Sequence, residues 1–181
     1  VDGGSRLGRE ILAGGSRYGA SQTPTEEQAA GFYEMAVARL EAVGLQRYEI
    51  SNFARPGYES AHNLKYWRLE PYMGFGADAH SFDGRFRRAN VESVEEYAER
   101  LESGASPVAQ EHEARLAEEK FFVGLRLREG VRPDAEDLQR FEGPIRRFLA
   151  AGLLESGQGV LRLTSRGVML SNEVFQEFIG I

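Results

Sequence analysis

The sequence of 181 residues contains no cysteine. This absence excludes disulfides, thiolate nucleophiles and every zinc or iron–sulfur site that needs cysteine ligands from this chain. Histidine occurs only three times and tryptophan once. His62, His80 and His112 lack the helical spacing of metal ligands, so we expect no metal site formed by this chain. His80 and Ser81 are sequence neighbours without a nucleophile elbow, so we also expect no hydrolytic centre.

Long apolar runs and an excess of basic residues are also missing. No run reaches 18 apolar residues, and the opening VDGGSRLGRE lacks the apolar stretch of a secretory signal, so we expect a cytoplasmic protein without a membrane span. The formal charge is −6, whereas nucleic-acid binding depends on clustered Lys and Arg, so nucleic acid is not an expected partner. Because the sequence begins within a Gly-rich stretch, we expect it to be a piece of a longer protein.

The first quarter of the chain predicts a helix followed by a strand. Residues 1–24 carry six glycines and form a Gly-rich lead-in that we expect to be flexible. Thr25 and Gln28 have the spacing of a capping box, and apolar residues then recur at three and four positions up to Gly44, which predicts a helix. In the following LQRYEISNFA, Tyr48 and Ile50 alternate with polar residues and predict a strand, an α/β pattern.

Short motifs in the middle of the chain predict a turn, a hairpin and a helix. RPGY at 55–58 predicts a turn. Asp83-Gly84 lies between alternating residues and predicts a hairpin in which both turn positions have positive φ. Ser93 and Glu96 form a second capping-box pattern that predicts a helix over 94–102, and SGASP then reads as a linker.

The last third predicts a small α+β domain over residues 111–181. Periodic apolar residues indicate three helices, at 113–127, 134–141 and 144–151, then two short strands around SGQG and a closing helix. This order is typical of a winged helix. The region is nearly neutral in charge, which favours packing or partner docking over DNA binding.

Residues 59–84, ESAHNLKYWRLEPYMGFGADAHSFDG, gather rings and glycines without helical or strand periodicity. His62, Tyr66 and Trp67 place one imidazole beside two large flat rings, which suits a planar hydrophobic ligand such as a porphyrin and equally suits ordinary core packing. Gly74 and Gly76 allow close approach to a phosphate, an adenosine or another strand. A Rossmann site is rejected because a hairpin, not a helix, follows the glycines.

The stretch YEISNFARPGYESAHNLKYWRLEPYMGFGADAHSF resembles the oxygen-independent coproporphyrinogen III oxidase-like proteins of the radical S-adenosylmethionine (SAM) superfamily. Its His-Asn-x-x-Tyr-Trp element resembles the haem chaperone branch. The resemblance implies an α/β fold, with the C-terminal part of a radical SAM (β/α) barrel over residues 25–110 and the winged-helix-like domain after it. It also implies a preceding half whose three cysteines hold a [4Fe-4S] cluster that binds SAM. Those cysteines are absent here, so we expect no radical chemistry from this chain alone.

The resemblance also implies which residues form a site. The candidates for haem contact, with the imidazole as the candidate iron ligand, are His62, Asn63, Tyr66 and Trp67. The candidates for cofactor contact, in a loop expected near the barrel mouth, are Gly74, Gly76 and His80. No catalytic residue is implied. Asp78 replaces a glycine that is common in the family, from which we expect that this position does not require positive φ.

Three functions are compatible with these residues. A haem chaperone would bind haem and pass it to an acceptor protein. A coproporphyrinogen III dehydrogenase would bind a porphyrinogen and decarboxylate two of its propionate side chains. A winged-helix module would bind nucleic acid or a partner protein. The His-Asn-x-x-Tyr-Trp element favours the chaperone.

Overall fold

A computed structural model describes residues 3–180, which divide into two compact units, one up to Val43 and one from Gly44 onward. Each unit is described by itself. Within the described residues, no helix combines the length and the apolar character that a bilayer span requires.

The first unit is entirely helical. It contains α1 (Arg6–Leu12), a 3-10 helix (Arg17–Gln22) and α2 (Glu26–Ala42), so much of the Gly-rich lead-in is helical. The capping box of α2 is confirmed: the Gln28 N–H donates to Thr25 Oγ1 (3.2 Å) and the Thr25 N–H donates to Gln28 Oε1 (3.0 Å). The apolar face that predicted this helix is solvent-exposed, because no residue of α2 is buried and Phe32 is 58% exposed.

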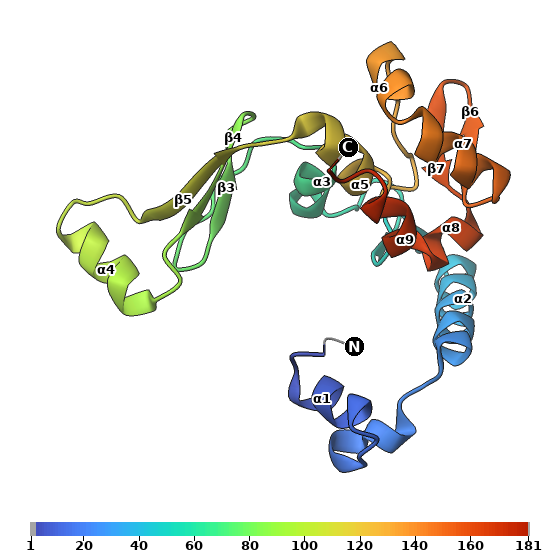
Figure 1. The fold of residues 1–181 in the computed structure, drawn as a ribbon, viewed down its shortest axis with the longest axis horizontal. Helices are drawn as coiled ribbons and strands as arrows, with labels where there is room; N and C mark the ends of the chain where they lie inside the picture. The colour runs from blue at the N-terminus through green and yellow to red at the C-terminus, as the bar shows by residue number, and fades with distance from the viewer. Residues whose placement is uncertain (1–2, 181) are drawn as a thin grey trace. The chain divides into compact units, whose positions relative to one another are not determined.

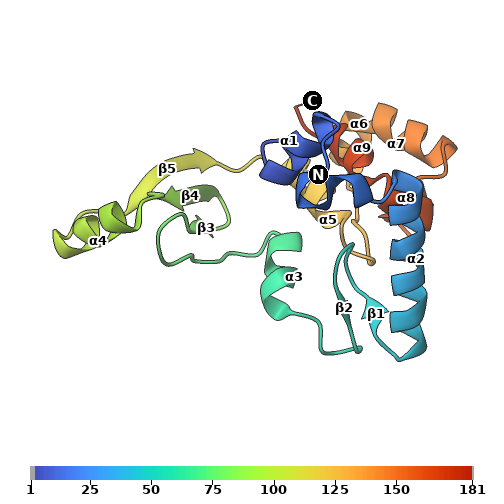
Figure 2. The same ribbon diagram turned by 90° about the horizontal axis from the view of Figure 1, so that it is seen from below.

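The second unit begins with a short antiparallel ribbon, β1 (Gln46–Arg47) and β2 (Phe53–Ala54), followed by α3 (Ala61–Trp67; Figure 2). The strand predicted through Tyr48 and Ile50 is wrong, because the chain reverses there. The Glu49 carboxylate accepts the Ser51 N–H (2.8 Å) and Asn52 Nδ2 (2.6 Å), which holds the reversal together.

A three-stranded antiparallel sheet follows, formed by β3 (His80–Phe82), β4 (Phe86–Asn90) and β5 (Val108–Glu113). Helix α4 (Val94–Glu102) connects β4 to β5, as Figure 1 shows, and confirms the helix predicted over these residues. The expected domain boundary between residues 110 and 111 lies inside β5, which hydrogen-bonds to β4 across that position.

The hairpin predicted at Asp83-Gly84 is present between β3 and β4, but its turn differs from the prediction. Only Gly84 has a positive φ (100°). Asp83 instead uses its side chain, because Oδ1 accepts the N–H groups of Arg85 (2.9 Å) and Phe86 (2.7 Å). Because the Asp83 side chain accepts hydrogen bonds from the following backbone, the turn forms without a positive φ at Asp83 itself.

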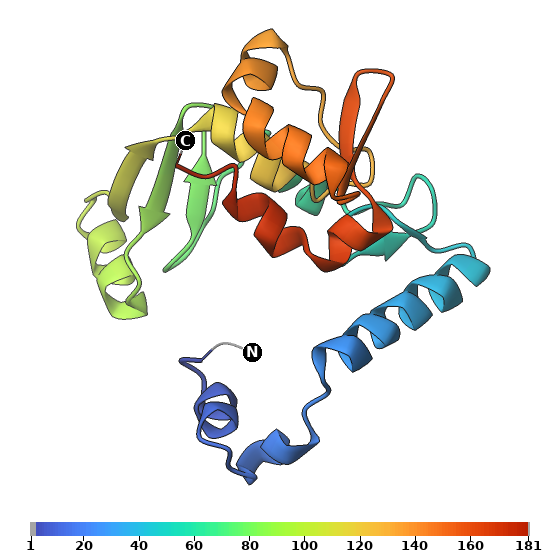
Figure 3. The same cartoon turned by 45° about the vertical axis from the view of Figure 1, so that its right-hand side comes forward.

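The remaining residues form a helical core with a β-ribbon. The elements are α5 (Leu116–Gly124), α6 (Ala135–Arg140), α7 (Glu142–Ala150), β6 (Leu154–Gly157), β7 (Val160–Leu163), α8 (Ser165–Met169) and α9 (Ser171–Gln176). Figure 3 shows these helices and the β-ribbon in yellow to red. Phe121, Phe141 and Phe178 are fully buried within this part of the chain, with ring centroids 4.7 to 5.3 Å apart. The closing helix was predicted as one and is two, because the helix ends at Leu170.

The observed fold is mixed α/β, as predicted, but every strand pair within residues 3–180 is antiparallel. Parallel strands joined by helices define a (β/α) barrel. The described residues therefore contain no parallel barrel strands of their own, and their apolar core lies in the C-terminal helices.

The aromatic core yields a stability prediction. Replacing fully buried Phe141 by alanine should lower the free energy of unfolding by roughly 3 to 5 kcal/mol, because it leaves a cavity between two rings. Urea unfolding followed by circular dichroism measures the change. Phe75→Ala is the control, since Phe75 is 80% exposed and its loss should cost within about 0.5 kcal/mol. Equal losses in the two variants would contradict this core.

The β3–β4 turn yields a prediction on pH. Hydrogen bonds from the Phe86 backbone, the Arg88 side chain and the Arg85 backbone lower the pKa of Asp83 from 3.8 to about 2. Since the folded pKa is depressed, the stabilisation is complete above about pH 4 and is lost as the pH falls through about 2. A carboxyl NMR titration should give this low pKa, and Asp83→Asn should remove the pH dependence from that window. An ordinary pKa would show that the turn does not form.

Candidate functional site

Helix α3 carries all four residues predicted to contact haem. Ser60 begins the helix by accepting the Asn63 N–H on its hydroxyl (3.3 Å), the usual role of an N-cap serine. His62 is exposed, while Asn63, Tyr66 and Trp67 are partly buried. The structure thus brings the four onto one short helix, but they do not all face the same way.

His62 and Tyr66 lie one helical turn apart and form a row of rings with Tyr72. The Tyr66 hydroxyl lies 3.1 Å from His62 Nε2, and the two rings meet edge to face with centroids 5.0 Å apart. Tyr66 and Tyr72 have centroids 4.4 Å apart. Burial raises the pKa of Tyr72, an effect that the Arg87 guanidinium partly offsets. This row offers one accessible imidazole beside aromatic surface.

Trp67 faces a different part of the molecule. Arg126, in the turn after α5, places its guanidinium carbon 4.5 Å from the centre of the Trp67 ring and 5.9 Å from that of Phe175. Trp67 also lines a small cavity of about 300 Å³ together with Gly124 and Val131. The indole is therefore separated from the imidazole of His62 and belongs to the junction between α3 and the helical core.

Glu49 completes this junction. Its side chain is fully buried, and Oε2 lies 3.8 Å from Arg126 Nε, an ion pair without a hydrogen bond. Three buried side-chain atoms in the described residues lack a hydrogen-bond partner: Glu49 Oε2, Arg126 Nε and Trp67 Nε1. All three belong to this one cluster. A buried carboxylate beside a single guanidinium depends strongly on that partner.

Sequence reasoning missed Glu49 and Arg126. Glu49 occupies a polar position of a predicted strand, where a charged residue normally faces solvent. Arg126 is 77 positions along the chain and belongs to a predicted helix. In the sequence, each of them is only a charged residue between two large apolar or aromatic neighbours. The same pattern occurs at many surface positions.

Gly74 and Gly76 are both required by the backbone, for different reasons. A Cβ at Gly74 would lie 2.2 Å from the His80 carbonyl oxygen, so only glycine fits there. Gly76 has a φ of 108°, donates its N–H to the Tyr97 hydroxyl (3.0 Å) and accepts Asn90 Nδ2 on its carbonyl (2.8 Å). These contacts join the loop to β4 and α4.

Asp78 corrects one expectation from the sequence. Its φ is 59°, so this position does adopt the left-handed conformation that glycine favours. Aspartate is one of the few residues that enters this region at modest cost, because its short polar side chain bonds locally. The presence of aspartate in place of glycine therefore does not indicate whether φ at this position is positive or negative.

His80 lies at the start of β3 and is exposed. It lines a groove of about 590 Å³, which Asp78, Glu92, Glu96 and Arg100 also line. Neither Gly74 nor Gly76 is among the residues that line this groove. Within the described residues, no group of three or more histidine, aspartate or glutamate side chains is placed to hold a metal ion.

Comparison with known proteins identifies relatives, although no protein-family model matches the sequence. "Heme chaperone HemW" of Bacillus subtilis is 38% identical over 172 residues, which cover 90% of this chain and 45% of that protein. The protein of the same name from Mycobacterium tuberculosis is 36% identical over 99% of this chain and 45% of its own length. "Radical S-adenosyl methionine domain-containing protein 1, mitochondrial" of Bos taurus is 32% identical over 86% of this chain and 38% of its own length.

The fold also matches a solved structure. It superposes on coproporphyrinogen III oxidase from Escherichia coli, a radical SAM enzyme, with a TM-score of 0.64 and 16% sequence identity, over 87% of this chain and 42% of that one. The chain spans 38% to 45% of the length of the curated relatives named above.

The junction around Arg126 yields a prediction. Arg126→Gln should lower the free energy of unfolding by roughly 3 kcal/mol, because it leaves the buried Glu49 carboxylate without its cation. It should also shift the fluorescence of Trp67, which is the sole tryptophan of the chain. Glu49→Gln added to this variant should restore part of the stability, since the unpaired charge is then removed. Unchanged stability and emission in Arg126→Gln would contradict the arrangement.

Proposed function

Because this chain belongs to the oxygen-independent coproporphyrinogen III oxidase-like family of radical SAM proteins, in its haem chaperone branch, and matches the C-terminal portion of that fold, we propose that it supplies the haem-binding helix of a haem chaperone. In this proposal helix α3 binds haem, and the haem then passes to an acceptor protein. The likeness to coproporphyrinogen III oxidase concerns the fold alone and favours no second activity.

The observation that carries this proposal is the exposed imidazole of His62 beside the rings of Tyr66 and Tyr72. A neutral imidazole is a common axial ligand of haem iron, and aromatic rings offer contacts to the flat macrocycle. The Tyr66 hydroxyl, 3.1 Å from Nε2, holds the imidazole in place before haem arrives and must release that nitrogen when iron binds there. An exposed ligand also suits transfer, since haem has to leave.

Asn63 and Trp67 support the helix in this proposal. Asn63 Nδ2 lies 3.5 Å from the Tyr48 hydroxyl, which connects α3 to the segment after β1. Trp67 anchors the C-terminal end of α3 against Arg126. Both side chains thus fix the orientation of the helix on which His62 is presented.

We also propose Gly74, Gly76 and His80 as a region of cofactor contact; the groove beside His80 supports that residue but not the two glycines. The two glycines already have a structural reason, which is close packing at Gly74 and a positive φ at Gly76. The chain does not fit a [4Fe-4S] cluster, because it has no cysteine to ligate iron. Cluster ligands would have to come from outside these 181 residues.

For the C-terminal region we propose the winged-helix-like domain expected from the sequence, used to dock a partner. The order of three helices, a two-stranded ribbon and a closing helical segment supports this assignment. The haem-accepting protein is the partner we propose for it.

Haem titration tests the proposal. Adding haem to the 181-residue chain should give a saturable Soret band, and His62→Ala should weaken binding about tenfold or more because the axial ligand is lost. His112→Ala is the matched control, since His112 is an exposed histidine on β5 that has no place in the proposed site. Equal spectra and affinities for all three proteins would refute His62 as the ligand.

A further inference from the structure

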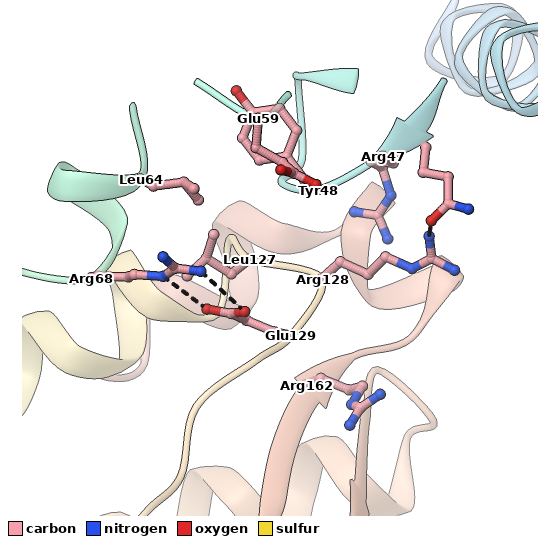
Figure 4. A pocket seen from close by; sticks show the side chains of 10 residues that line it. Arg47, Tyr48, Glu59, Leu64, Arg68, Leu127, Arg128, Glu129 and Arg162 are labelled. Atoms are coloured by element: carbon pink, nitrogen blue, oxygen red, sulfur yellow. Dashed lines mark hydrogen bonds and ion pairs between the residues drawn. The ribbon is translucent and has the colours of Figure 1, made fainter. Parts of the chain in front are cut away.

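A third pocket lies on another side of α3. It has a volume of about 550 Å³ and is formed by β1, the C-terminal end of α3, the turn after α5, and β7 (Figure 4). Four of the residues that line it are arginines: Arg47, Arg68, Arg128 and Arg162. Their side chains converge from segments that are far apart in the sequence, in a chain whose formal charge is −6.

Only one of these four guanidinium groups has a strong counterion. Arg68 forms two hydrogen bonds to the Glu129 carboxylate (3.0 and 3.3 Å), which raise the pKa of Arg68. The other acidic residue of the pocket, Glu59, accepts the Gly57 N–H on both carboxylate oxygens (3.2 and 3.0 Å).

The three remaining arginines lack such partners. The backbone of Arg47 pairs with β2, but its guanidinium forms no hydrogen bond or ion pair with any described residue. Arg128 Nη1 lies 3.5 Å from Gln46 Oε1, a neutral amide. Arg162 Nε lies 3.8 Å from the Glu155 carboxylate, beyond hydrogen-bonding distance. Figure 4 shows Arg47 and Arg128 extending to the same side of the pocket, opposite the Arg68–Glu129 pair.

Several arginines elsewhere in this unit have a closer carboxylate partner, although Arg126 and Arg146 also lie 3.8 Å from theirs. Arg85 lies 3.0 Å from Glu113, Arg88 lies 2.7 Å from Asp83, and Arg140 lies 3.0 Å from Glu118. Like charges held together without counterions repel one another, and an anion between them relieves that repulsion. The guanidinium fork matches phosphate and carboxylate oxygens in particular, through two parallel hydrogen bonds.

The pocket also offers apolar surface. Leu64 and Leu127 line it, together with Tyr48. A concave site of this volume, with apolar walls and a few charged groups, has the usual dimensions of a small-molecule site. We propose that this pocket binds a small organic molecule that carries several phosphate or carboxylate groups, with Arg47, Arg128 and Arg162 contacting its oxyanions.

This site is independent of the proposed haem site. Leu64 and Arg68 face the pocket from α3, whereas His62 and Tyr66 are not among its lining residues. Residues two positions apart on a helix lie on nearly opposite faces, which separates the two sets of side chains. The anion site can therefore exist whether or not this chain binds haem.

Calorimetry with two probes tests the proposal on the 181-residue chain. Pyrophosphate and citrate are titrated separately at low and physiological salt, and saturable one-site binding of either probe supports the site. The stronger probe distinguishes phosphate from carboxylate recognition. Arg47→Gln and Arg128→Gln should each weaken that binding about tenfold, the loss expected for a charge-assisted hydrogen bond. Arg128→Lys, which keeps the charge but loses the fork, should also bind more weakly.

Arg146→Gln is the control, because Arg146 is an exposed arginine on α7 outside the pocket, 3.8 Å from Glu142. It should bind as tightly as the parent chain. Circular dichroism establishes whether each variant is folded. If Arg128→Gln does not fold, Arg128→Lys replaces it in the test. The proposal is overturned if neither probe binds saturably, or if Arg146→Gln weakens binding as much as the pocket variants do.

Discussion

The contact of Arg126 with Glu49 and Trp67 is the interaction on which the position of α3 depends. Glu49 is fully buried in the reversal between β1 and β2, Trp67 ends α3, and Arg126 follows α5. Three segments distant in sequence therefore meet at one guanidinium. A backbone hydrogen bond from the Arg128 N–H to the Tyr48 carbonyl (3.0 Å) lies beside it and fixes the same approach. Removing the cation would leave a buried carboxylate unpaired, which costs more than the ion pair itself contributes.

Because one side of α3 is anchored to the helical core, the directions of its other side chains are fixed as well. With Trp67 against the helical core, His62 and Tyr66 point away from Arg126, toward Tyr72 and solvent. Leu64 and Arg68 take a third direction, toward the arginine-lined pocket. A helix of seven residues thus serves the core, the proposed haem contact and the proposed anion site at once. It can do so because residues one to two positions apart point in different directions around a helix.

The apolar surfaces of the chain are distributed unevenly. The residues from α5 onward bury Phe121, Phe141 and Phe178 completely, while α2 buries none of its residues. An amphipathic helix normally gains its stability from packing its apolar face. Helix α2 instead relies, within its own unit, on its capping box and on helix-forming residues. Its helical character is therefore encoded locally, whereas its apolar face has no core in that unit.

The sequence alone determined the helix starts and the turn that are stabilised by interactions between residues close together in the chain. Thr25 and Gln28, Ser93 with its neighbours, and the Asp83-Gly84 turn act through hydrogen bonds between positions two to three apart. The family resemblance was also readable, because the His-Asn-x-x-Tyr-Trp element is a contiguous pattern, and the four residues proposed from it for haem contact lie together on α3. Tertiary structure decided the rest: the reversal at Glu49, the outward face of His62 as opposed to Trp67, and the convergence of four arginines. These features depend on contacts between residues tens of positions apart, and burial of one side chain by a distant partner leaves no local periodicity to detect.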